Sequence, residues 1–217
     1  MKKTILIFGA NGFLAKAFIN KFESTYHILP VYKTSSEHKN LAFDFFNEDF
    51  DAFAKTINYE LDGILFLQGL NPTKGIEDIT PGDFKKMTAV NLIAPLFLIR
   101  ILSKKIKTNA SIIFISSIAK KKGSYDPSYA TAKAGINGLI ASLANAYPNY
   151  RFNSLSLGLV ENSPVFNTMT LDFKKKHAER MHRNQFIQVQ NVLNGLEFLI
   201  NNTNINKQDI AIDGGYL

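Results

Sequence analysis

The segment TILIFGANGFLA, residues 4–15, decides the fold that we expect for this chain. Its first five residues are apolar and rich in β-branched side chains, which is typical of a strand buried on both faces of a sheet. From Leu14, apolar residues recur at helical spacing through Phe22. The segment therefore predicts a strand, a glycine-rich turn and a helix, in that order.

The turn in this segment has the features of a phosphate-binding turn. Gly9 permits a tight turn, Gly12 permits a close approach of the backbone to a pyrophosphate, and Ala15 stands where helix and strand pack. The N-terminus of the following helix offers N–H donors and the positive end of the helix dipole. The pattern predicts a dinucleotide site, with an ordinary strand–helix turn as the alternative.

Alternating strand and helix patterns continue along the rest of the chain. We expect further buried strands over residues 27–32, 41–45, 61–67, 111–115, 151–158 and 210–213. We expect helices over residues 49–59, 81–102 and 192–200, and a polar segment with one helical patch over residues 159–190. The alternation predicts an α/β fold, a Rossmann-type doubly wound parallel sheet of about seven strands with helices on both faces, in a single domain.

The bulk composition argues against several classes of protein. The 217 residues carry a formal charge of +7, but the basic residues are dispersed and no nucleic-acid motif accompanies them. The absence of Cys excludes a disulfide framework, and His177 and His182 lack the spacing of a metal site. No apolar run reaches the roughly 18 residues that a membrane span needs. We therefore expect a cytoplasmic protein that binds no nucleic acid, membrane or metal.

The residues after the second strand bear on the choice of dinucleotide. An NAD site usually has an acidic residue about 20 positions after the glycines, which binds the ribose 2′-hydroxyl. Lys33 and Ser35 stand in its place, and these side chains suit a 2′-phosphate, although they are also common in exposed loops. We therefore favour NADP(H) over NAD(H). Gly9, Lys33 and Gly69 follow strands and Asp44 lies at the end of one, so the four residues should meet at the carboxyl edge of the sheet, where ligands bind.

A second segment, SYATAKAG at residues 128–135, places Tyr129 and Lys133 four positions apart. On a helix the two side chains lie on one face, one turn apart. An ammonium beside a phenol favours the phenolate, so it lowers the tyrosine pKa from about 10 and suits the residue to proton transfer. The alternative is an ordinary surface pair. Asn91, in an apolar helical segment, and Ser117, at the end of a strand, are further polar candidates.

Taken together, these segments resemble the short-chain dehydrogenase/reductase family, in its compact single-domain branch. The resemblance spans residues 4–215 and includes the motifs Ala-Val-Asn-Leu, Ile-Ser-Ser-Ile-Ala and Asp-Gly-Gly. It implies hydride transfer between a nicotinamide and a carbonyl or secondary alcohol, a small-molecule substrate, and a homodimer or homotetramer. The catalytic residues that it implies are Asn91, Ser117, Tyr129 and Lys133. The cofactor-binding residues that it implies are Gly9, Asn11, Gly12, Phe13, Leu14, Lys33, Ser35, Asp44, Phe45, Gln68, Gly69, Tyr129, Lys133, Gly158 and Val160.

The family mechanism implies a role for each catalytic residue. Tyr129 would act as the general acid and base, and Lys133 would lower its pKa and hydrogen-bond the nicotinamide ribose. Ser117 would hydrogen-bond the substrate oxygen, as an oxyanion-type donor does. Asn91 would hold a water that links Lys133 to solvent. The polar segment 159–190 would form the substrate lid.

Several positions depart from the family pattern. Phe8 stands where a Thr usually precedes the first glycine, and Leu67-Gln68-Gly69 replaces the usual Asn-Ala-Gly. The glycine spacing G-x-x-G-x-x-A is nearer to the family's sugar-nucleotide-modifying branch. The interval to Tyr129 is about one residue short from Ser117 and normal from Ser116. We therefore keep two alternatives to a dehydrogenase: a sugar-nucleotide epimerase or dehydratase, and a nucleotide-binding protein without catalysis.

Overall fold

A computed structural model of the chain describes residues 1–34, 41–46, 49–70 and 73–216. Its strands are β1 (Thr4–Phe8), β2 (His27–Tyr32), β3 (Leu41–Ala42), β4 (Leu61–Phe66), β5 (Ile106–Ser117), β6 (Arg151–Leu157) and β7 (Asp209–Ile212). Its α-helices are α1 (Phe13–Phe22), α2 (Phe50–Thr56), α3 (Pro81–Thr88), α4 (Ala94–Leu102), α5 (Ala119–Lys122), α6 (Pro127–Ala146), α7 (Pro164–Thr168), α8 (Leu171–Ala178) and α9 (Val189–Asn201). A π-helical turn, η1 (Ala89–Ile93), joins α3 to α4, and η2 (Ser103–Lys105) and η3 (His182–Asn184) are 3₁₀ turns.

The strands form one parallel sheet in the order β3-β2-β1-β4-β5-β6-β7. The direction of the winding reverses between β1 and β4. In a sheet of this kind, ligands bind beyond the carboxyl ends of the strands at that reversal. The topology confirms the predicted Rossmann-type fold, and it places the glycine turn at the reversal because that turn follows β1.

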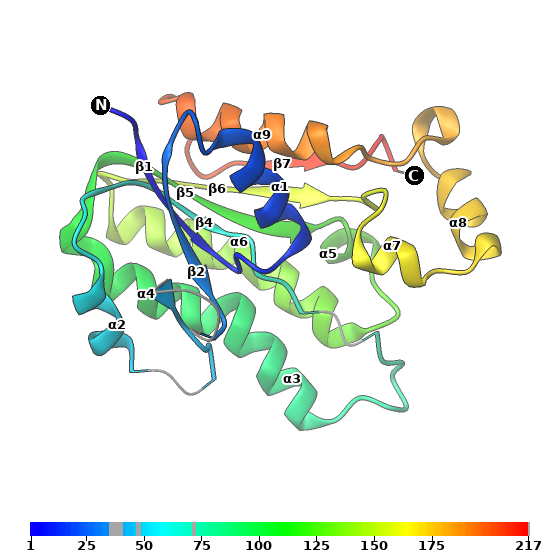
Figure 1. Cartoon of the computed structure of the whole chain (residues 1–217). Coiled ribbons are helices and arrows are strands. Elements are labelled where there is room, and N and C mark those ends of the chain that lie inside the picture. Colours follow the sequence, from blue (N-terminus) through cyan, green and yellow to red (C-terminus); the bar gives the residue numbers. More distant parts are fainter. Residues whose placement is uncertain (35–40, 47–48, 71–72, 217) are drawn as a thin grey trace.

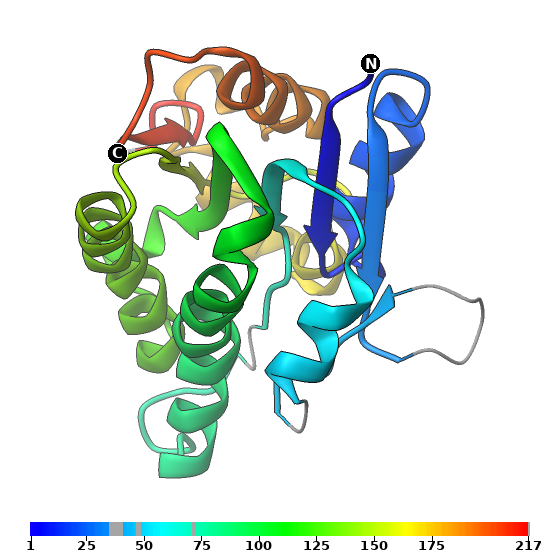
Figure 2. The ribbon, with the colours of Figure 1, turned by 90° about the vertical axis from the view of Figure 1, so that its left-hand side faces the viewer.

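Each face of the sheet packs against its own helices (Figures 1 and 2). A first core lies on the face covered by α2, α4 and α6, and a second core lies on the face covered by α1 and α9. Strand β1 supplies both cores in alternation, with Leu6 and Phe8 in the first and Ile5 and Ile7 in the second. This double burial is the physical reason for the continuous apolar run at residues 4–8.

Phe8 shows why an aromatic residue can precede the first glycine. Its ring stacks on Phe66 of β4 with centroids 5.2 Å apart, and Phe66 stacks in turn on Phe114 of β5 at 5.0 Å. Phe43 and Phe53 meet the Phe8 ring from the side, at 6.3 and 5.7 Å. The residue therefore belongs to an aromatic layer that runs across three neighbouring strands of the first core.

Several predicted elements differ from the structure. The strand expected over residues 111–115 is β5, which begins earlier, at Ile106, and ends at Ser117. The helix expected over residues 49–59 is α2, which ends at Thr56. The third strand ends at Ala42 rather than at residue 45, because it lies at the sheet edge and pairs with β2 alone. The helix expected over residues 81–102 contains the wide turn η1, which apolar periodicity does not reveal. The polar segment 159–190 holds two helices, α7 and α8, where one helical patch was expected.

The helical run Pro81–Lys105 is long and apolar enough, by length and composition, to cross a membrane. In this fold, 44% of its most apolar window is buried. Leu98, Ile99 and Leu102 of α4 pack in the first core. Core helices of this composition occur in many α/β proteins, so the run is explained by its place against the sheet.

A buried arginine joins β6 to the end of α9. Arg151 is 5% exposed, and its guanidinium donates to the carbonyls of Leu199 (2.9 Å), Ile200 (3.2 Å) and Asn202 (2.7 Å). Its Nε also donates to the carbonyl of Asn109, at 3.2 Å. The cation thus satisfies carbonyls that a helix C-terminus leaves without donors, and it complements the negative end of the helix dipole.

We expect Arg151→Met to lower the free energy of unfolding by about 2–4 kcal/mol, because it leaves several buried carbonyls without a donor. Urea denaturation of the purified variant measures this loss. Arg100→Met removes an exposed arginine of α4 and should cost about 1 kcal/mol or less. Equal losses in the two variants would contradict the assigned role of Arg151.

Candidate active site

The glycine turn brings β1, α1 and the end of β4 into contact. Gly9 has a φ of 82°, a conformation that favours glycine, and a Cβ there would lie 2.7 Å from backbone atoms of Gln68. The Gly12 N–H donates to the Gly9 carbonyl at 2.8 Å. Gly12 is also the N-cap of α1, and it supplies no side-chain acceptor to the first turn, which begins with Phe13 and Leu14. The backbone N–H groups of this first turn are therefore left for a ligand. A dinucleotide pyrophosphate can accept hydrogen bonds from them, so the turn fits such a group.

Asn11 and Lys33 come together beside this turn. The backbone N–H of Lys33 donates to Asn11 Oδ1 at 3.4 Å, and both residues are exposed. The Ala10 N–H donates to the Val31 carbonyl at 3.0 Å, which holds the turn against the end of β2. Ser35, the other predicted contact of this region, lies outside the described residues.

Asp44 and Phe45 follow β3 in a turn of their own. Asp44 Oδ1 accepts from the Phe46 N–H at 3.1 Å, so this carboxylate stabilises the turn. Phe45 is half-buried, and its ring lies 5.5 Å from Phe43 and 6.2 Å from Phe8. The side chain of Phe45 therefore packs on the aromatic layer of the first core.

The remaining predicted cofactor contacts lie at the ends of β4 and β6. Gly69 is exposed, and a Cβ there would meet no atom within 4 Å. Gly158 lies under Ile187 and Asp213, since a Cβ would come within 2.9 Å of the first and 3.1 Å of the second. Val160 is buried in the second core and forms a β-bridge with Ile187, so a ligand contact there would involve backbone atoms.

Tyr129 and Lys133 lie on one face of α6, as their spacing predicts. Lys133 Nζ is 5.8 Å from the centroid of the Tyr129 ring. Lys133 is 3% exposed, and its Nζ donates to the Ile115 carbonyl of β5 at 2.8 Å. The pair therefore faces the carboxyl edge of the sheet, where β5 ends.

The two neighbouring serines at the end of β5 have different partners. The Ser117 hydroxyl hydrogen-bonds the Tyr129 side chain, and Ser117 Oγ accepts from the Ala119 N–H at 3.1 Å. Ser116 Oγ instead donates to the backbone carbonyl of Lys133, at 3.2 Å. Both serines thus bond to α6, but only Ser117 has the Tyr129 phenol as its partner. The geometry favours Ser117 over Ser116.

Asn91 is buried in the middle of η1, with 3% of its surface exposed. Its Nδ2 donates to the Met87 carbonyl at 2.9 Å, which accounts for one of its polar groups. Pro95 has no N–H, so it cannot give the Asn91 carbonyl the donor that a regular helix would supply. A π-helical turn of this kind is often found at functional sites.

Residues 44–217 match the model of a family described as enoyl-(acyl carrier protein) reductase. This match covers well over half of the chain. The chain belongs to this family of short-chain dehydrogenases/reductases. A comparison with curated protein sequences finds no match.

Solved structures of short-chain dehydrogenases/reductases share the fold over the whole chain. A protein from Brucella melitensis, described as a glucose/ribitol dehydrogenase of this family, is 17% identical, has a TM-score of 0.88 and covers 100% of each chain. A family member from Francisella tularensis is 22% identical, with a TM-score of 0.84 and coverage of 100% and 99%. A 4-hydroxyisoleucine dehydrogenase complexed with NADH is 20% identical, with a TM-score of 0.84 and coverage of 99% and 98%. At these identities the likeness concerns the fold.

Burial dominates the electrostatics of the short-chain dehydrogenase/reductase site. Burial raises the pKa of the Tyr129 phenol above its usual value of 10.0, and the hydrogen bond with Ser117 offsets this in part. That Lys133 lowers this pKa stays a prediction. Desolvation also lowers the pKa of Lys133 itself, to about 8, so its ammonium is easily deprotonated. The Lys133 Nζ is held beside the Tyr129 ring by its hydrogen bond to the Ile115 carbonyl.

Sequence reasoning missed Asp126, which orients the start of α6. Asp126 is 1% exposed, and its Oδ1 accepts from the Tyr129 N–H (3.1 Å) and the Ser128 hydroxyl (2.6 Å). Its Oδ2 accepts from the Lys74 N–H at 3.3 Å, so the loop after β4 is held against α6. The signal in the sequence is an Asp directly before Pro127, which is typical of a helix N-terminus.

The two ends of segment 159–190 pair through backbone hydrogen bonds and form a closed stem at the carboxyl edge of the sheet. The Glu161 N–H donates to the Ile187 carbonyl at 2.9 Å, and the Ile187 N–H donates to the Leu159 carbonyl at 3.2 Å. Between these positions the segment carries α7 and α8, which project beyond the two helical layers (Figure 1). The stem lies beside Gly158, so the segment begins where β6 reaches the site.

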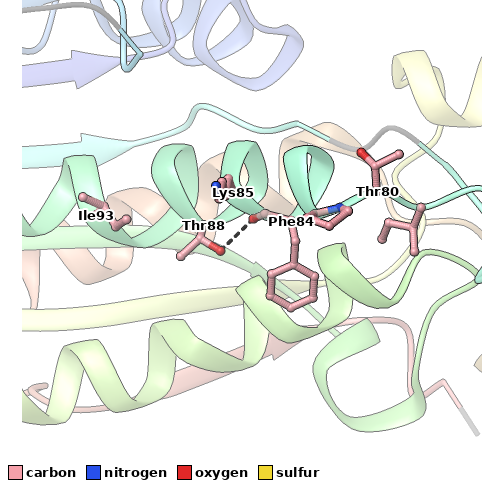
Figure 3. Close-up of a pocket in the computed structure, with 7 residues that line it drawn as sticks. Thr80, Phe84, Lys85, Thr88 and Ile93 are labelled. Atoms are coloured by element: carbon pink, nitrogen blue, oxygen red, sulfur yellow. Dashed lines mark hydrogen bonds between the residues drawn. The ribbon is translucent and has the colours of Figure 1, made fainter.

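A separate pocket of about 610 Å³ lies on the outer side of α3 and η1 (Figure 3). Phe84, Thr88 and Ile93 line it, and the Thr88 hydroxyl donates to the Phe84 carbonyl at 2.8 Å. Neither Tyr129 nor Ser117 lines this pocket, so it is distinct from the candidate active site.

The buried Lys133 should make stability depend on pH. Its pKa is about 8 in the folded protein and 10.5 when exposed, so the unfolded chain binds more protons between these values and stability rises with pH there. From pH 7 to pH 10 we expect a gain of about 2 kcal/mol in the wild type that Lys133→Met lacks. Urea denaturation at both pH values measures the difference. Equal gains in the two proteins would show that Lys133 is not desolvated.

Proposed function

We propose that this short-chain dehydrogenase/reductase is an NADP(H)-dependent oxidoreductase that interconverts a carbonyl compound and a secondary alcohol. The observation that carries the proposal is the meeting of Ser117 and Lys133 at Tyr129, at the carboxyl edge of the sheet. The glycine turn lies on the same edge, at the ends of β1 and β4. A bound nicotinamide would supply or accept the hydride.

Tyr129 and Ser117 handle the reacting oxygen in this proposal. The Tyr129 hydroxyl gives its proton to the substrate oxygen during reduction and takes a proton back during oxidation. Ser117 Oγ accepts a hydrogen bond from the Ala119 N–H, which leaves the hydroxyl proton of Ser117 available as a donor. In this proposal that proton is donated to the substrate oxygen as negative charge develops there. Ser117 is buried and Tyr129 is half-buried, and the lower dielectric of such surroundings strengthens these hydrogen bonds.

Lys133 has two roles in this proposal, as a hydrogen-bond donor and as a proton carrier. Its ammonium has three N–H donors, and the Ile115 carbonyl takes one of them. We assign the other two to the nicotinamide ribose and to a water at the Asn91 carbonyl. Because the pKa of Lys133 is about 8, the group can pass a proton to the phenol and recover it through that water.

The preference for NADP(H) rests on the end of β2. Lys33 is exposed beside Asn11, next to the turn that would hold the pyrophosphate. A lysine at this position favours a 2′-phosphate over a bare ribose. NADH is the competing coenzyme, since the similar 4-hydroxyisoleucine dehydrogenase is complexed with it.

Segment 159–190 is our candidate for the substrate lid, since it rises from a closed stem beside the site. Lids of this kind exclude water and select the substrate. The substrates to test first are ketones and aldehydes. An enoyl thioester belongs in the same panel, because the matching family model is described as a reductase of enoyl-(acyl carrier protein).

We expect NADPH to raise the thermal midpoint of the protein more than NADH does at equal concentration. A ligand present at roughly 100 times its Kd adds about 3 kcal/mol of stability, and binding to Lys33 adds to the affinity for NADPH alone. Lys33→Glu should reverse the order of the two shifts, whereas Lys55→Glu, on exposed α2, should leave it unchanged. A larger shift with NADH in the wild type would contradict the proposed preference.

With a substrate found in the panel, Tyr129→Phe should lower kcat by at least ~100-fold, because it removes the proton donor. NADPH affinity, measured by nicotinamide fluorescence, should change little. Tyr125→Phe alters an exposed phenol four residues away and serves as the matched control, with near wild-type kcat. If Tyr129→Phe retained wild-type turnover, another group would have to be the acid.

A further inference from the structure

The carbonyl of Val90 has no donor within its own helix. In a regular α-helix the N–H of Ala94 would serve it, but that N–H donates to the Ala89 carbonyl in η1. The next residue is Pro95, which has no N–H at all. A buried carbonyl without a donor costs free energy, so the turn needs a partner from another part of the fold.

Gln68 supplies that partner from the end of β4. Its Nε2 donates to the Val90 carbonyl at 3.2 Å. Since a carbonyl can only accept, the chemistry fixes the orientation of the amide, with the NH₂ group toward Val90. Gln68 stands in the middle of the segment that replaces Asn-Ala-Gly, where the family pattern has an alanine. An alanine at this position has no side-chain group that could make the bond.

Gln68 also touches the glycine turn through its backbone, because a Cβ on Gly9 would lie 2.7 Å from it. The turn η1, which Gln68 contacts through its side chain, also packs closely on α6, the helix that carries Tyr129 and Lys133. A Cβ on Gly135 would lie 2.7 Å from Leu92 Cδ1, and Gly135 is two residues beyond Lys133 on α6. Direct contacts thus lead from the glycine turn through Gln68 and η1 to the helix that carries the proposed acid.

We propose that Gln68 is a positioning residue that couples the glycine turn to η1, so that a dinucleotide held at the turn orders the backbone around Asn91. The inference rests on the proposed coenzyme binding. Gln68 has its main chain against the turn and its side chain on η1, so it can transmit a change in one to the other. Its Oε1 is buried and finds no donor among the described residues, which leaves the bond to Val90 as the side chain's single anchor there.

Hydrogen exchange tests the coupling without any substrate. Amide exchange of residues 89–93 is compared with and without whichever of NADPH and NADH binds better. In the wild type, we expect the coenzyme to slow this exchange by about 10-fold, and in Gln68→Met by less than about 2-fold. Each protein is compared at a coenzyme concentration that saturates it, so a change in the affinity of Gln68→Met cannot imitate a loss of coupling. Gln190→Met, which alters an exposed amide of α9, should respond like the wild type.

A second variant keeps the test informative if Gln68→Met folds poorly. Adding Pro95→Ala restores an N–H to the helix, so Gln68→Met/Pro95→Ala should regain stability while exchange at 89–93 stays insensitive to the coenzyme. Coenzyme-dependent slowing in either Gln68 variant would overturn the proposal. So would a wild type that binds the coenzyme with no change at 89–93. A wild type that binds neither coenzyme would instead contradict the proposed function.

Discussion

The contact between Gly9 and Gln68 is the constraint on which the candidate site depends. The two residues follow neighbouring parallel strands, and their backbones approach so closely that a single added Cβ would overlap. A larger residue at position 9 would push the end of β4 away from α1. The pyrophosphate turn and the support of η1 would then separate, because Gln68 contributes to both. Glycine is required here for close approach as well as for its positive φ.

Much of the fold could be predicted because its strands are buried on both faces. Such strands are mostly apolar runs, and residues 4–8, and 63–66 after Asp62, stand out between the turns that flank them. The turn η1 could not be predicted from periodicity, because Val90 and Leu92 keep an apolar pattern in a helix of either width. The cause is one missing N–H at Pro95, and whether a helix kinks or widens around a proline depends on its neighbours.

Only part of the candidate site could be predicted from the sequence. The pairing of Tyr129 with Lys133 follows from helical spacing, and the Ser-Ser at the end of β5 follows from the strand pattern. The choice between Ser116 and Ser117 requires the facing helix, since both serines bond to α6 but only Ser117 has the Tyr129 phenol as its partner. The raised pKa of Tyr129 was not predictable, because desolvation depends on segments that are distant in sequence.

The closed stem of segment 159–190 has an evolutionary consequence. The Ile187 N–H donates to the Leu159 carbonyl and the Glu161 N–H donates to the Ile187 carbonyl, so the residues between them form an excursion with fixed ends. Ile187 also packs in the second core. Insertions in such an excursion cost little, because the entropy of closing a loop grows only slowly with its length. Natural variation can therefore rebuild α7 and α8 and leave the proton-transfer machinery in place. The same scaffold can acquire a new substrate range through changes in α7 and α8, while Met181, buried in the second core, keeps the segment anchored.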